Sequence, residues 1–495
     1  MIFLGYTWIK FTLQISSEPL LIICLQGREN VTVIRDDGVE ERYFGIKYTP
    51  NNTVMEHLEF ALKYETINLS LLTQIFAKID ASVIIDVIKN KPQGINVRKI
   101  GFLFEFLTQQ TLNIDFAVGG KYVSILDESI YVTGKGVNHE KWKIRNNLLG
   151  MSNFCPVILK TLTIQSAMEF DVAKSLFNFQ KIYSQSVFRR TFGYLYTKET
   201  KSSFEIEREK PSQNKMERFV TLLTKAGIEN DPIFLTESTL TDKQNKIVDS
   251  RFAADGWRDF QNYIGETLPD FSQLVHYVCP PADLVKPMME DLNACFQKSK
   301  DNHAVIVATI VAFGFVFIHP FDDGNGRLHR YLIHDILVRK KAVSSGTIIP
   351  ISAQMLENIE EYDNILESYS QPLLSFIKFS LDNQGELTIL NPSEVMPYFK
   401  YPNLTLQCEY LFKTLVAAIT KIEFELDYLN KYDLLKNEIS NQLDLPDKML
   451  NNLIIFIHQN QGILSKNKRK IFDKLTDSEI KMIEEMYQKI FIKVL

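Results

Sequence analysis

The sequence predicts a mostly α-helical protein of several domains with a small β component. Apolar residues recur at helical spacing in most of the long segments, whereas the alternation typical of strands occurs in short stretches. The chain has 495 residues, which suggests about three domains of roughly 150 residues each. Apolar residues make up 45% of it, enough for sizeable hydrophobic cores.

The composition argues against several classes of protein. A net charge of -5 does not suit a chain that coats nucleic acid, although a local basic face is compatible with it. The apolar start, residues 1–26, is interrupted by polar residues, so we expect neither a signal peptide nor a membrane span. The five cysteines show no metal-ligand spacing, and we interpret them as reduced core residues of a cytoplasmic protein: Cys24, Cys155, Cys279, Cys295 and Cys408.

Residues 1–165 are expected to form an α+β N-terminal region, to which we assign no role. Residues 60–79 and 100–107 have apolar residues at helical spacing. Residues 122–126 and 130–132 read as a short strand pair, with the turn formers of 127–129 between them.

Residues 166–390 are expected to form a second domain. Helical spacing recurs in 166–195, 212–227, 242–253 and 284–296, and the nearly continuous apolar run of 304–317 predicts a buried helix. An alternating segment that includes Ile264 and Gly265, followed by a second one at 274–278, predicts a β-hairpin with its turn at 266–270.

The most informative stretch, residues 317–330, begins with groups suited to proton and metal chemistry. His319 can take up a proton near neutral pH. Asp323 is a hard oxygen ligand of the kind that Mg²⁺ prefers. Both lie within a few residues of a glycine-rich turn, so we expect the two groups to serve one site.

The rest of this stretch is suited to binding phosphate. Gly324, Asn325 and Gly326 let the bare backbone approach an anion, because glycine tolerates a positive φ and has no side chain. The following apolar periodicity predicts a helix whose N-terminus favours negative charge. Arg327 and Arg330 are three residues apart on that helix, so both are expected on one face of it.

This stretch resembles the Fic motif, His-Pro-Phe-x-(Asp/Glu)-Gly-Asn-Gly-Arg-x-x-Arg, at every specified position. The alternative is a glycine-rich turn after a core histidine, which does not need so many fixed residues. The resemblance implies a Fic-type helical domain that transfers AMP from ATP to a Ser, Thr or Tyr hydroxyl of a protein. It also implies that the hairpin is a flap, which registers the target segment by strand addition and covers the nucleotide; the alternative is an ordinary surface hairpin.

The resemblance assigns roles to individual residues. His319 would be the general base that deprotonates the target hydroxyl, Asp323 would hold the Mg²⁺ that bridges two phosphates, and Arg330 would bind the terminal phosphate. Tyr362, in a segment that matches the family at 360–368, would contact the nucleotide. The full set expected to border the nucleotide is Glu207, Ile264, Gly265, Asp323, Gly324, Asn325, Gly326, Arg327, Leu328, His329, Arg330 and Tyr362.

A second resemblance lies at residues 200–208, which are similar to the Fic inhibitory motif, (Ser/Thr)-x-x-x-Glu-(Gly/Asn). Ser203 and Glu207 occupy its fixed positions and are four residues apart, on one face of a helix. The resemblance implies that Glu207 pairs with Arg330 and blocks the γ-phosphate. Arg208 stands where the family has Gly or Asn.

The same segment allows another interpretation, which could coexist with the first. Ser202 and Glu205 have the spacing of a capping box, in which they would begin a helix rather than regulate a site.

Residues 403–495 are expected to form a winged-helix-like C-terminal domain. Helices are predicted at 404–428, 434–443 and 448–459, with a turn at 444–446, and residues 462–470 could form a basic wing. Thr476 and Glu479 are expected to cap a last helix, since they have the spacing of a capping box. Such folds often mediate protein contacts; DNA binding is the alternative.

From these features we expect a protein adenylyltransferase that uses ATP and Mg²⁺, modifies a hydroxyl of a protein or of itself, and is inhibited by its own Glu207. Two alternatives stay open: a Fic-fold enzyme that transfers another group or removes AMP, and a nucleotide-sensing DNA-binding regulator. We expect no membrane partner.

Overall fold

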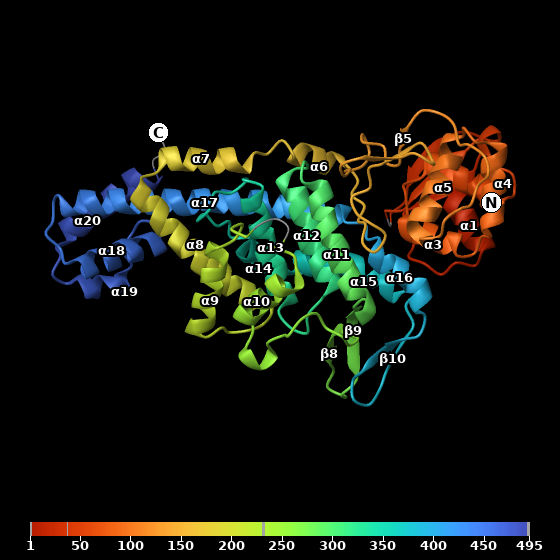
Figure 1. The fold of residues 1–495 in the computed structure, drawn as a ribbon. Helices are drawn as coiled ribbons and strands as arrows, with labels where there is room; N and C mark the ends of the chain where they lie inside the picture. Colours follow the sequence, from red (N-terminus) through yellow and green to blue (C-terminus); the bar gives the residue numbers. More distant parts are fainter. Residues whose placement is uncertain (1, 37, 230–232, 493–495) are drawn as a thin grey trace.

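The computed structural model describes residues 2–36, 38–229 and 233–492. The first residue of the predicted N-terminal region and the last three of the predicted C-terminal domain lie outside these ranges. Helices dominate and the sheets are small, so the predicted mostly-α fold class is confirmed. Figure 1 shows an N-terminal unit, a central helical region and a C-terminal helical unit, in a row along the molecule.

The N-terminal unit combines helices with a four-stranded sheet of order β1-β2-β4-β3, in which β2 and β4 run parallel. Asn68 separates two helices within the predicted helical segment 60–79, because its side chain accepts a hydrogen bond from the Leu71 N–H and so begins α3. The elements are β1 (Phe3–Leu4), α1 (Gly5–Thr12), β2 (Ile22–Gln26), β3 (Val31–Ile34), β4 (Glu40–Phe44), the 3₁₀ helix η1 (Ile46–Tyr48), α2 (Val54–Tyr64), α3 (Leu69–Phe76), α4 (Ala81–Asn90) and α5 (Ile95–Thr108).

The predicted strand pair of 122–126 with 130–132 is wrong. β5 (Val123–Ser124) pairs in parallel with β7 (Ile144–Asn146), and β6 (Val137–His139) pairs with the other edge of β7. The Asp127 carbonyl accepts a hydrogen bond from the Tyr131 N–H at 2.9 Å, which closes a tight turn directly after β5. Tyr131 then forms an isolated bridge with Leu159 instead of returning along β5.

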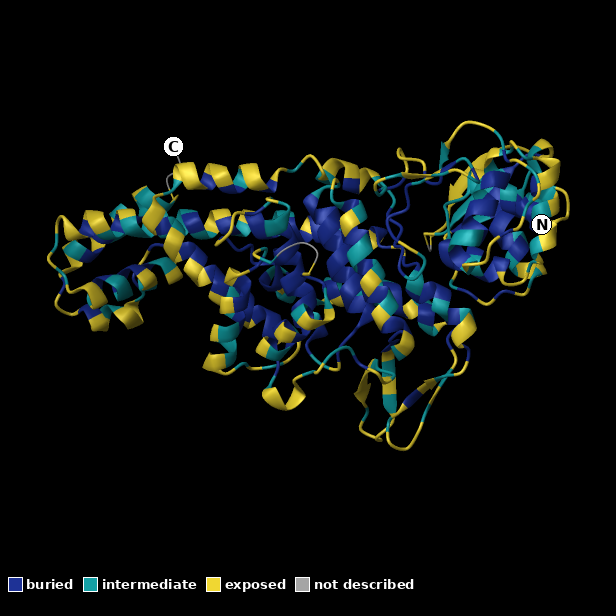
Figure 2. Ribbon diagram, viewed as in Figure 1, coloured by how far each residue is buried: buried dark blue, intermediate teal, exposed yellow. Residues whose placement is uncertain are grey.

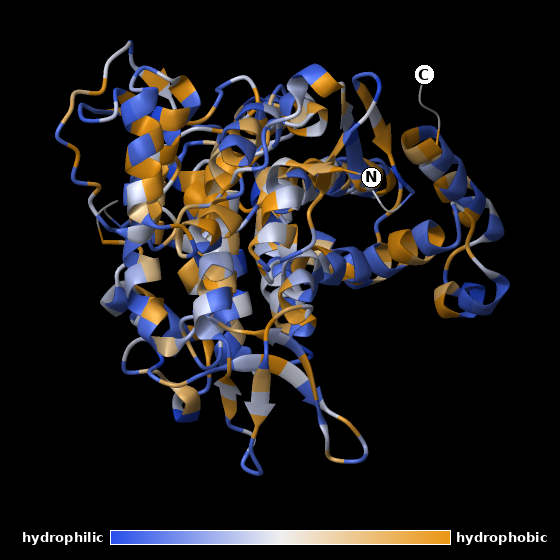
Figure 3. Cartoon of the chain, turned by 90° about the vertical axis from the view of Figure 1, so that its right-hand side faces the viewer, coloured by the Kyte–Doolittle hydropathy of each residue, from blue (hydrophilic) through white to orange (hydrophobic). Residues whose placement is uncertain are grey.

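The central region is built around α12, every residue of which is buried. A helix that is apolar on all sides is typical of a core, and α12 lies against α11, α13 and α17. Buried and apolar residues gather in these central helices (Figures 2 and 3). The elements are α6 (Leu162–Ala167), α7 (Val172–Ile182), α8 (Gln185–Ile206), α9 (Gln213–Thr224), α10 (Glu237–Ile247), η2 (Ser250–Phe252), α11 (Ala282–Ser299), α12 (Ala304–Ile318), α13 (Asn325–Arg339), α14 (Ile351–Glu357), α15 (Ile359–Leu374) and α16 (Pro392–Lys400).

Two β-hairpins extend from the central region (Figure 1). The predicted hairpin is formed by β8 (Tyr263–Thr267) and β9 (Gln273–Val278), with a bulge between Ile264 and Gly265. Its loop spans 268–272, two residues later than predicted, because the β8 pairing continues through Thr267. A second hairpin, β10 (Phe379–Leu381) with β11 (Leu387–Ile389), is one that the sequence analysis did not predict.

The C-terminal unit differs from the prediction in two respects. The helices expected at 404–428 and 434–443 are one helix, α17 (Thr405–Ser440), because 429–433 contains no glycine or proline to interrupt it. The expected wing at 462–470 contains a short helix, α19 (Lys466–Arg469), and the described part of 403–492 contains no strand. The remaining elements are α18 (Asp447–Gln459), the 3₁₀ helix η3 (Lys470–Phe472), α20 (Asp477–Tyr487) and the π-helical η4 (Gln488–Ile492).

The predicted capping box is present at the start of α20. The Thr476 side chain accepts from the Glu479 N–H, and the Glu479 carboxylate accepts from the Thr476 N–H. Within the described ranges, none of the helices combines the length and apolar character needed to cross a bilayer.

Candidate functional site

The site begins where α12 ends, at His319. This residue has a φ of 53°, in the left-handed region, which costs a non-glycine residue on the order of 1–2 kcal/mol. The conformation is fixed on both sides: the His319 N–H donates to the Phe315 carbonyl at 2.9 Å, and the His319 carbonyl accepts from Arg258 Nε at 2.8 Å. His319 is therefore held rigidly at the end of a buried helix.

The ring of His319 is prepared to act as a base. Its Nδ1 lies 3.3 Å from the Val316 carbonyl, an acceptor, so Nδ1 carries the proton and Nε2 of the neutral ring has the free lone pair. Burial and, after it, the charge of Arg258 lower the pKa of His319 to about 4, against smaller raising effects of the Val316 carbonyl, Glu207 and Asp323. The imidazole is thus neutral at pH 7 and able to accept a proton.

Arg258 is a site residue that the sequence analysis missed. It is 5% exposed, and besides the His319 carbonyl it donates to the carbonyls of Phe260 and Pro280, both at 2.7 Å. Its backbone N–H donates to the Pro320 carbonyl at 2.9 Å. Arg258 therefore joins the base of the β8–β9 hairpin to the loop that carries His319.

The glycine turn between α12 and α13 has the conformation that an anion site needs. Gly324 has a φ of 91°, and α13 begins at the next residue. The Asn325 side chain closes the turn by accepting from the Phe321 N–H at 3.0 Å and donating to the Phe321 carbonyl at 2.8 Å. The first turn of α13 consequently presents its N-terminus next to the loop of His319.

Glu207 lies against this turn. A side-chain carbon added at Gly326 would collide with Glu207 Oε1, so a carboxylate oxygen occupies the space that the glycine leaves open. The same oxygen accepts from Arg330 Nη2 at 2.8 Å. The structure therefore brings Glu207 and Arg330 together at the N-terminal turn of α13.

Arg330 is held mainly by α8. Its side chain is 1% exposed, its Nε donates to Ser203 Oγ at 2.9 Å, and its Nη2 donates to the Ser203 carbonyl at 2.7 Å. Burial alone would lower the pKa of Arg330, but the charge and hydrogen bond of Glu207, together with Tyr362, outweigh it and the pKa is raised. Ser203 and Glu207 thus act on the same guanidinium from one helix face.

The end of α8 explains the unusual residue at position 208. The Glu209 N–H donates to the Phe204 carbonyl and the Arg208 N–H to the Glu205 carbonyl, which is the Schellman pattern of a helix C-terminus. Arg208 occupies the left-handed position of this motif with a φ of 57°. Glycine and asparagine suit that conformation best, which accounts physically for the Gly or Asn of the motif it resembles.

The capping-box interpretation of Ser202 and Glu205 is wrong. Both residues lie in the last turns of α8, whereas a capping box belongs to the first turn of a helix. The N-cap of α8 is Ser184, whose side chain accepts from the Val187 N–H.

Arg327 contacts two carboxylates. Its Nη2 donates to Asp323 Oδ1 at 2.6 Å, and its Nη1 donates to Glu209 Oε2 at 2.7 Å. Asp323 also accepts from the Gly324 N–H at 2.6 Å. The sequence analysis did not predict a role for Glu209, since its partner is 118 residues away and no local pattern links the two.

Of the other predicted site residues, Tyr362 lies beside Arg330 and Glu207, whereas the side chains of two others lie in the core. Tyr362, on α15, is buried, and the charges of Arg330 and Glu207 both act on its hydroxyl, whose pKa burial raises. The side chains of Leu328 and His329 lie in the core instead, where His329 Nδ1 contacts the Ala312 carbonyl at 2.8 Å and burial lowers the pKa to about 3.

The predicted flap residues are on β8. Ile264 is 42% exposed, and Gly265 lies close to the Leu274 carbonyl of the facing strand. The base of the hairpin reaches the catalytic loop through Asn262, whose side chain donates to the Phe321 carbonyl at 3.5 Å, in addition to the contacts of Arg258.

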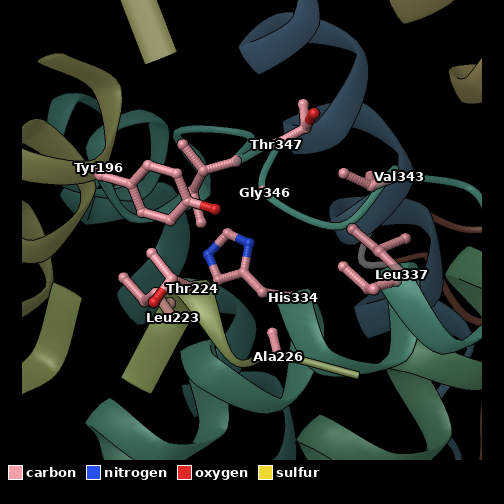
Figure 4. A pocket seen from close by; sticks show the side chains of 11 residues that line it. Tyr196, Leu223, Thr224, Ala226, His334, Leu337, Val343, Gly346 and Thr347 are labelled. Atoms are coloured by element: carbon pink, nitrogen blue, oxygen red, sulfur yellow. The ribbon is translucent and has the colours of Figure 1, made fainter. Parts of the chain in front are cut away.

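His334, which lines the small cavity shown in Figure 4, ties α13 to α8 one turn beyond Arg330 through a buried polar contact. His334 Nε2 lies 2.8 Å from Glu199 Oε1, and the Ser352 N–H donates to Glu199 Oε2 at 2.8 Å. The adjoining cavity, which Tyr196, Thr224 and His334 help to line, has a volume of about 10 Å³. That is room for about one water molecule, so this cavity does not hold a nucleotide.

The carboxylates of the site do not form a complete metal cage. Within the described residues, no group of three or more His, Cys, Asp or Glu side chains is arranged to hold a metal ion. Mg²⁺ commonly binds through one or two carboxylates together with substrate phosphates and water. Asp323, whose side chain is 48% exposed, fits that kind of site.

One family model matches part of the chain. Residues 234–337 match the Fic/DOC family model, a segment that includes the β8–β9 hairpin, α11, α12 and most of α13. A search of curated proteins gave no significant match.

Two solved structures are similar to the chain. A Fic family protein from Desulfovibrio desulfuricans G20 is 16% identical, with a TM-score of 0.38 over 66% of this chain and 87% of that one. A Fic domain containing signaling protein from Bacteroides thetaiotaomicron VPI-5482 is 16% identical, with a TM-score of 0.34 over 52% of this chain and 97% of that one.

Proposed function

The chain contains a Fic domain, and we propose that it is a protein adenylyltransferase, which transfers AMP from ATP to a Ser, Thr or Tyr hydroxyl of a protein. One observation carries the proposal. The carboxylate of Glu207 rests on the glycine turn and on Arg330, at a helix N-terminus that favours an anion. An internal carboxylate in this place stands in for a phosphate group.

The arrangement supports a direct displacement at phosphorus. Nε2 of His319 accepts the proton of the target hydroxyl, the hydroxyl oxygen forms a bond to the α-phosphorus, and the bond from that phosphorus to the bridging oxygen breaks, releasing pyrophosphate. Arg327 and Arg330 counter the phosphate charge, which is the main contribution a protein makes to this class of reaction. The neutral, rigidly held ring of His319 suits the role of base.

Asp323 would hold Mg²⁺ together with phosphate oxygens, and the ion would neutralise charge on the leaving pyrophosphate. Asp323 is now bonded to Arg327 and to the Gly324 N–H. Both of these contacts use Oδ1, so the partly exposed carboxylate could offer its other oxygen to the metal.

Glu207 would inhibit the enzyme by competing with the terminal phosphate. Arg330 is buried and always charged, so the group that pairs with it is decided by competition between anions. While Glu207 is in place, ATP lacks this contact and binds with its α-phosphate out of line with the hydroxyl. Removing the carboxylate should therefore raise transfer more than it raises ATP affinity.

The proposal is tested with ATP labelled on the α- or the γ-phosphate. We expect the Glu207→Gly variant to incorporate α-label, not γ-label, into itself or into lysate proteins, and the double variant with His319→Ala to lose this label. Glu205→Gly is the matched control, since Glu205 lies on the same helix end but pairs with Lys201 outside the site. Incorporation of γ-label would contradict the proposed AMP transfer, and α-label incorporation that is equal in Glu205→Gly and Glu207→Gly would contradict the inhibitory role of Glu207.

A further inference from the structure

The second phosphate-binding arginine of the site also has an internal partner. The Arg327 side chain is 4% exposed, and Glu209 Oε2 accepts from its Nη1 at 2.7 Å. Glu209 is two residues beyond Glu207, and its side chain is 28% exposed. A partly exposed carboxylate therefore covers a buried cation here, as Glu207 does at Arg330.

The backbone at the end of α8 fixes the two carboxylates relative to each other. Glu207 is the C-cap residue, Arg208 is in the left-handed conformation, and the Glu209 N–H returns to the Phe204 carbonyl at 3.0 Å. This reversal sends the Glu209 side chain back toward α13 instead of away from it. One structural unit, the Schellman turn, thus presents both acidic side chains to the two arginines.

Glu209 also has a second cationic contact. Its Oε1 accepts from Lys215 Nζ, at the start of α9, while Oε2 stays on Arg327. A carboxylate displaced from Arg327 would therefore keep a partner outside the phosphate site. The carboxylate does not have to become unpaired for the site to open.

We propose that Glu209 is a second inhibitory carboxylate, which withholds Arg327 from phosphate while Glu207 withholds Arg330. The inference rests on the proposed role of the two arginines as phosphate ligands, and it concerns the regulation of that same site. Since one turn carries both acids, displacement of that turn removes Glu207 from Arg330 and Glu209 from Arg327 together. Substitution of Glu207 alone frees only Arg330.

The test measures nucleotide affinity, which does not require AMP transfer. Dissociation constants of ADP and ATP are determined by calorimetry on the full chain for the parent, Glu207→Gln, Glu209→Gln and the double variant. Glu205→Gln is the matched control on the exposed face of the same helix. We expect Glu209→Gln to tighten ADP by about five- to tenfold, as for loss of a competing charge-assisted contact, and to tighten ATP by no more than ADP.

Substitution of the two carboxylates should change the ADP and ATP affinities in different ratios. Glu207→Gln should tighten ATP relative to ADP, because the terminal phosphate gains Arg330, and the double variant should show both gains. If Glu209→Gln instead tightens ATP relative to ADP, as Glu207→Gln does, the turn has merely loosened and the inference is wrong. Unchanged ADP affinity in Glu209→Gln overturns it as well.

The outcome separates this inference from the proposed reaction. Arg327→Ala should weaken ADP binding; if it does not, Arg327 is no phosphate ligand and the inference fails at its premise. If the affinities change as expected but no variant incorporates α-label, the proposed adenylyl transfer fails and the role of Glu209 in nucleotide binding stands.

Discussion

The loop that carries His319 and the turn that carries Glu207 and Glu209 share one backbone feature but differ in their surroundings. Each places a non-glycine residue in the left-handed region directly after a helix, His319 after α12 and Arg208 after α8. His319 is buried and its carbonyl is bonded to Arg258, whereas Arg208 is exposed at the surface. Strain that is held by buried contacts gives a fixed geometry, and strain at an exposed helix end gives a segment that can be displaced. We therefore call the loop of His319 the fixed side of the site and the end of α8 the movable side.

The largest effect is expected from substitution of His319, the proposed base. His319→Ala should lower AMP transfer by about 10²- to 10⁴-fold, since it removes the proton acceptor. ADP affinity should change little, because the arginines and the glycine turn remain. Rates are measured in the Glu207→Gly background, where the parent activity is high enough to follow the loss. Undiminished transfer would mean that another group is the base.

Removal of the Arg258 side chain, which holds the His319 carbonyl, should mainly lower the free energy of unfolding. Arg258→Ala leaves three backbone carbonyls without their donor, two of them in buried hydrogen bonds, so the free energy of unfolding should fall by about 3 kcal/mol. Urea denaturation measures this. The matched control is Arg251→Ala, because Arg251 is 79% exposed and pairs with Asp249 at the surface, where ion pairs contribute about 0–1 kcal/mol. Equal losses of unfolding free energy in the two variants would show that Arg258 does not hold the His319 loop in place.

Lowering the pH should destabilise the folded protein through the buried ring of His319. The pKa of His319 in the folded state is about 4 and burial is the main cause, while a solvated histidine titrates near 6.5. The unfolded chain binds the proton first, so the stability contributed by the neutral ring is complete above about pH 6.5 and is lost as the pH falls toward 4. Between pH 7 and 5 the parent should lose about 2 kcal/mol more than His319→Gln, in urea titrations at each pH. Parallel pH profiles of the two proteins would argue against this.

The smallest effect is expected on the movable side. Arg208→Gly removes the left-handed strain at the end of α8 and should stabilise the protein by about 0.5–1 kcal/mol. A better-formed turn holds both carboxylates more firmly, so the basal transfer rate should fall a few-fold. Glu205→Gly, in the helical part of the same segment, should instead destabilise by about 1 kcal/mol. Thermal unfolding and a transfer assay check both variants, and a basal rate that rises in Arg208→Gly would contradict the strain argument.

The sequence pointed to the candidate site residues but not to the residues that hold them in place, and the reason is physical. His319, Asp323 and the two motif arginines are close in sequence and carry a dense pattern, as do Ser203 and Glu207. Arg258 and Glu209 act through partners 61 and 118 residues away, and no local periodicity records such contacts. The break predicted within α17 was wrong for a different, local reason: 429–433 contains no glycine or proline, so the helix runs through it.

The length of α17 has a mechanical consequence. At 1.5 Å per residue, its 36 residues extend about 54 Å. Its first part packs in the central core as far as Leu426, and its last part packs with the C-terminal helices from Leu435. It is also joined to α8 by the ion pairs of Lys198 with Glu425 and of Arg190 with Asp433. The helix therefore runs as one element from the central core to the C-terminal helices, and it also packs directly on α8. A tilt of about 5° would move its far end by about 5 Å, and its packing and ion pairs with α8 would shift with it.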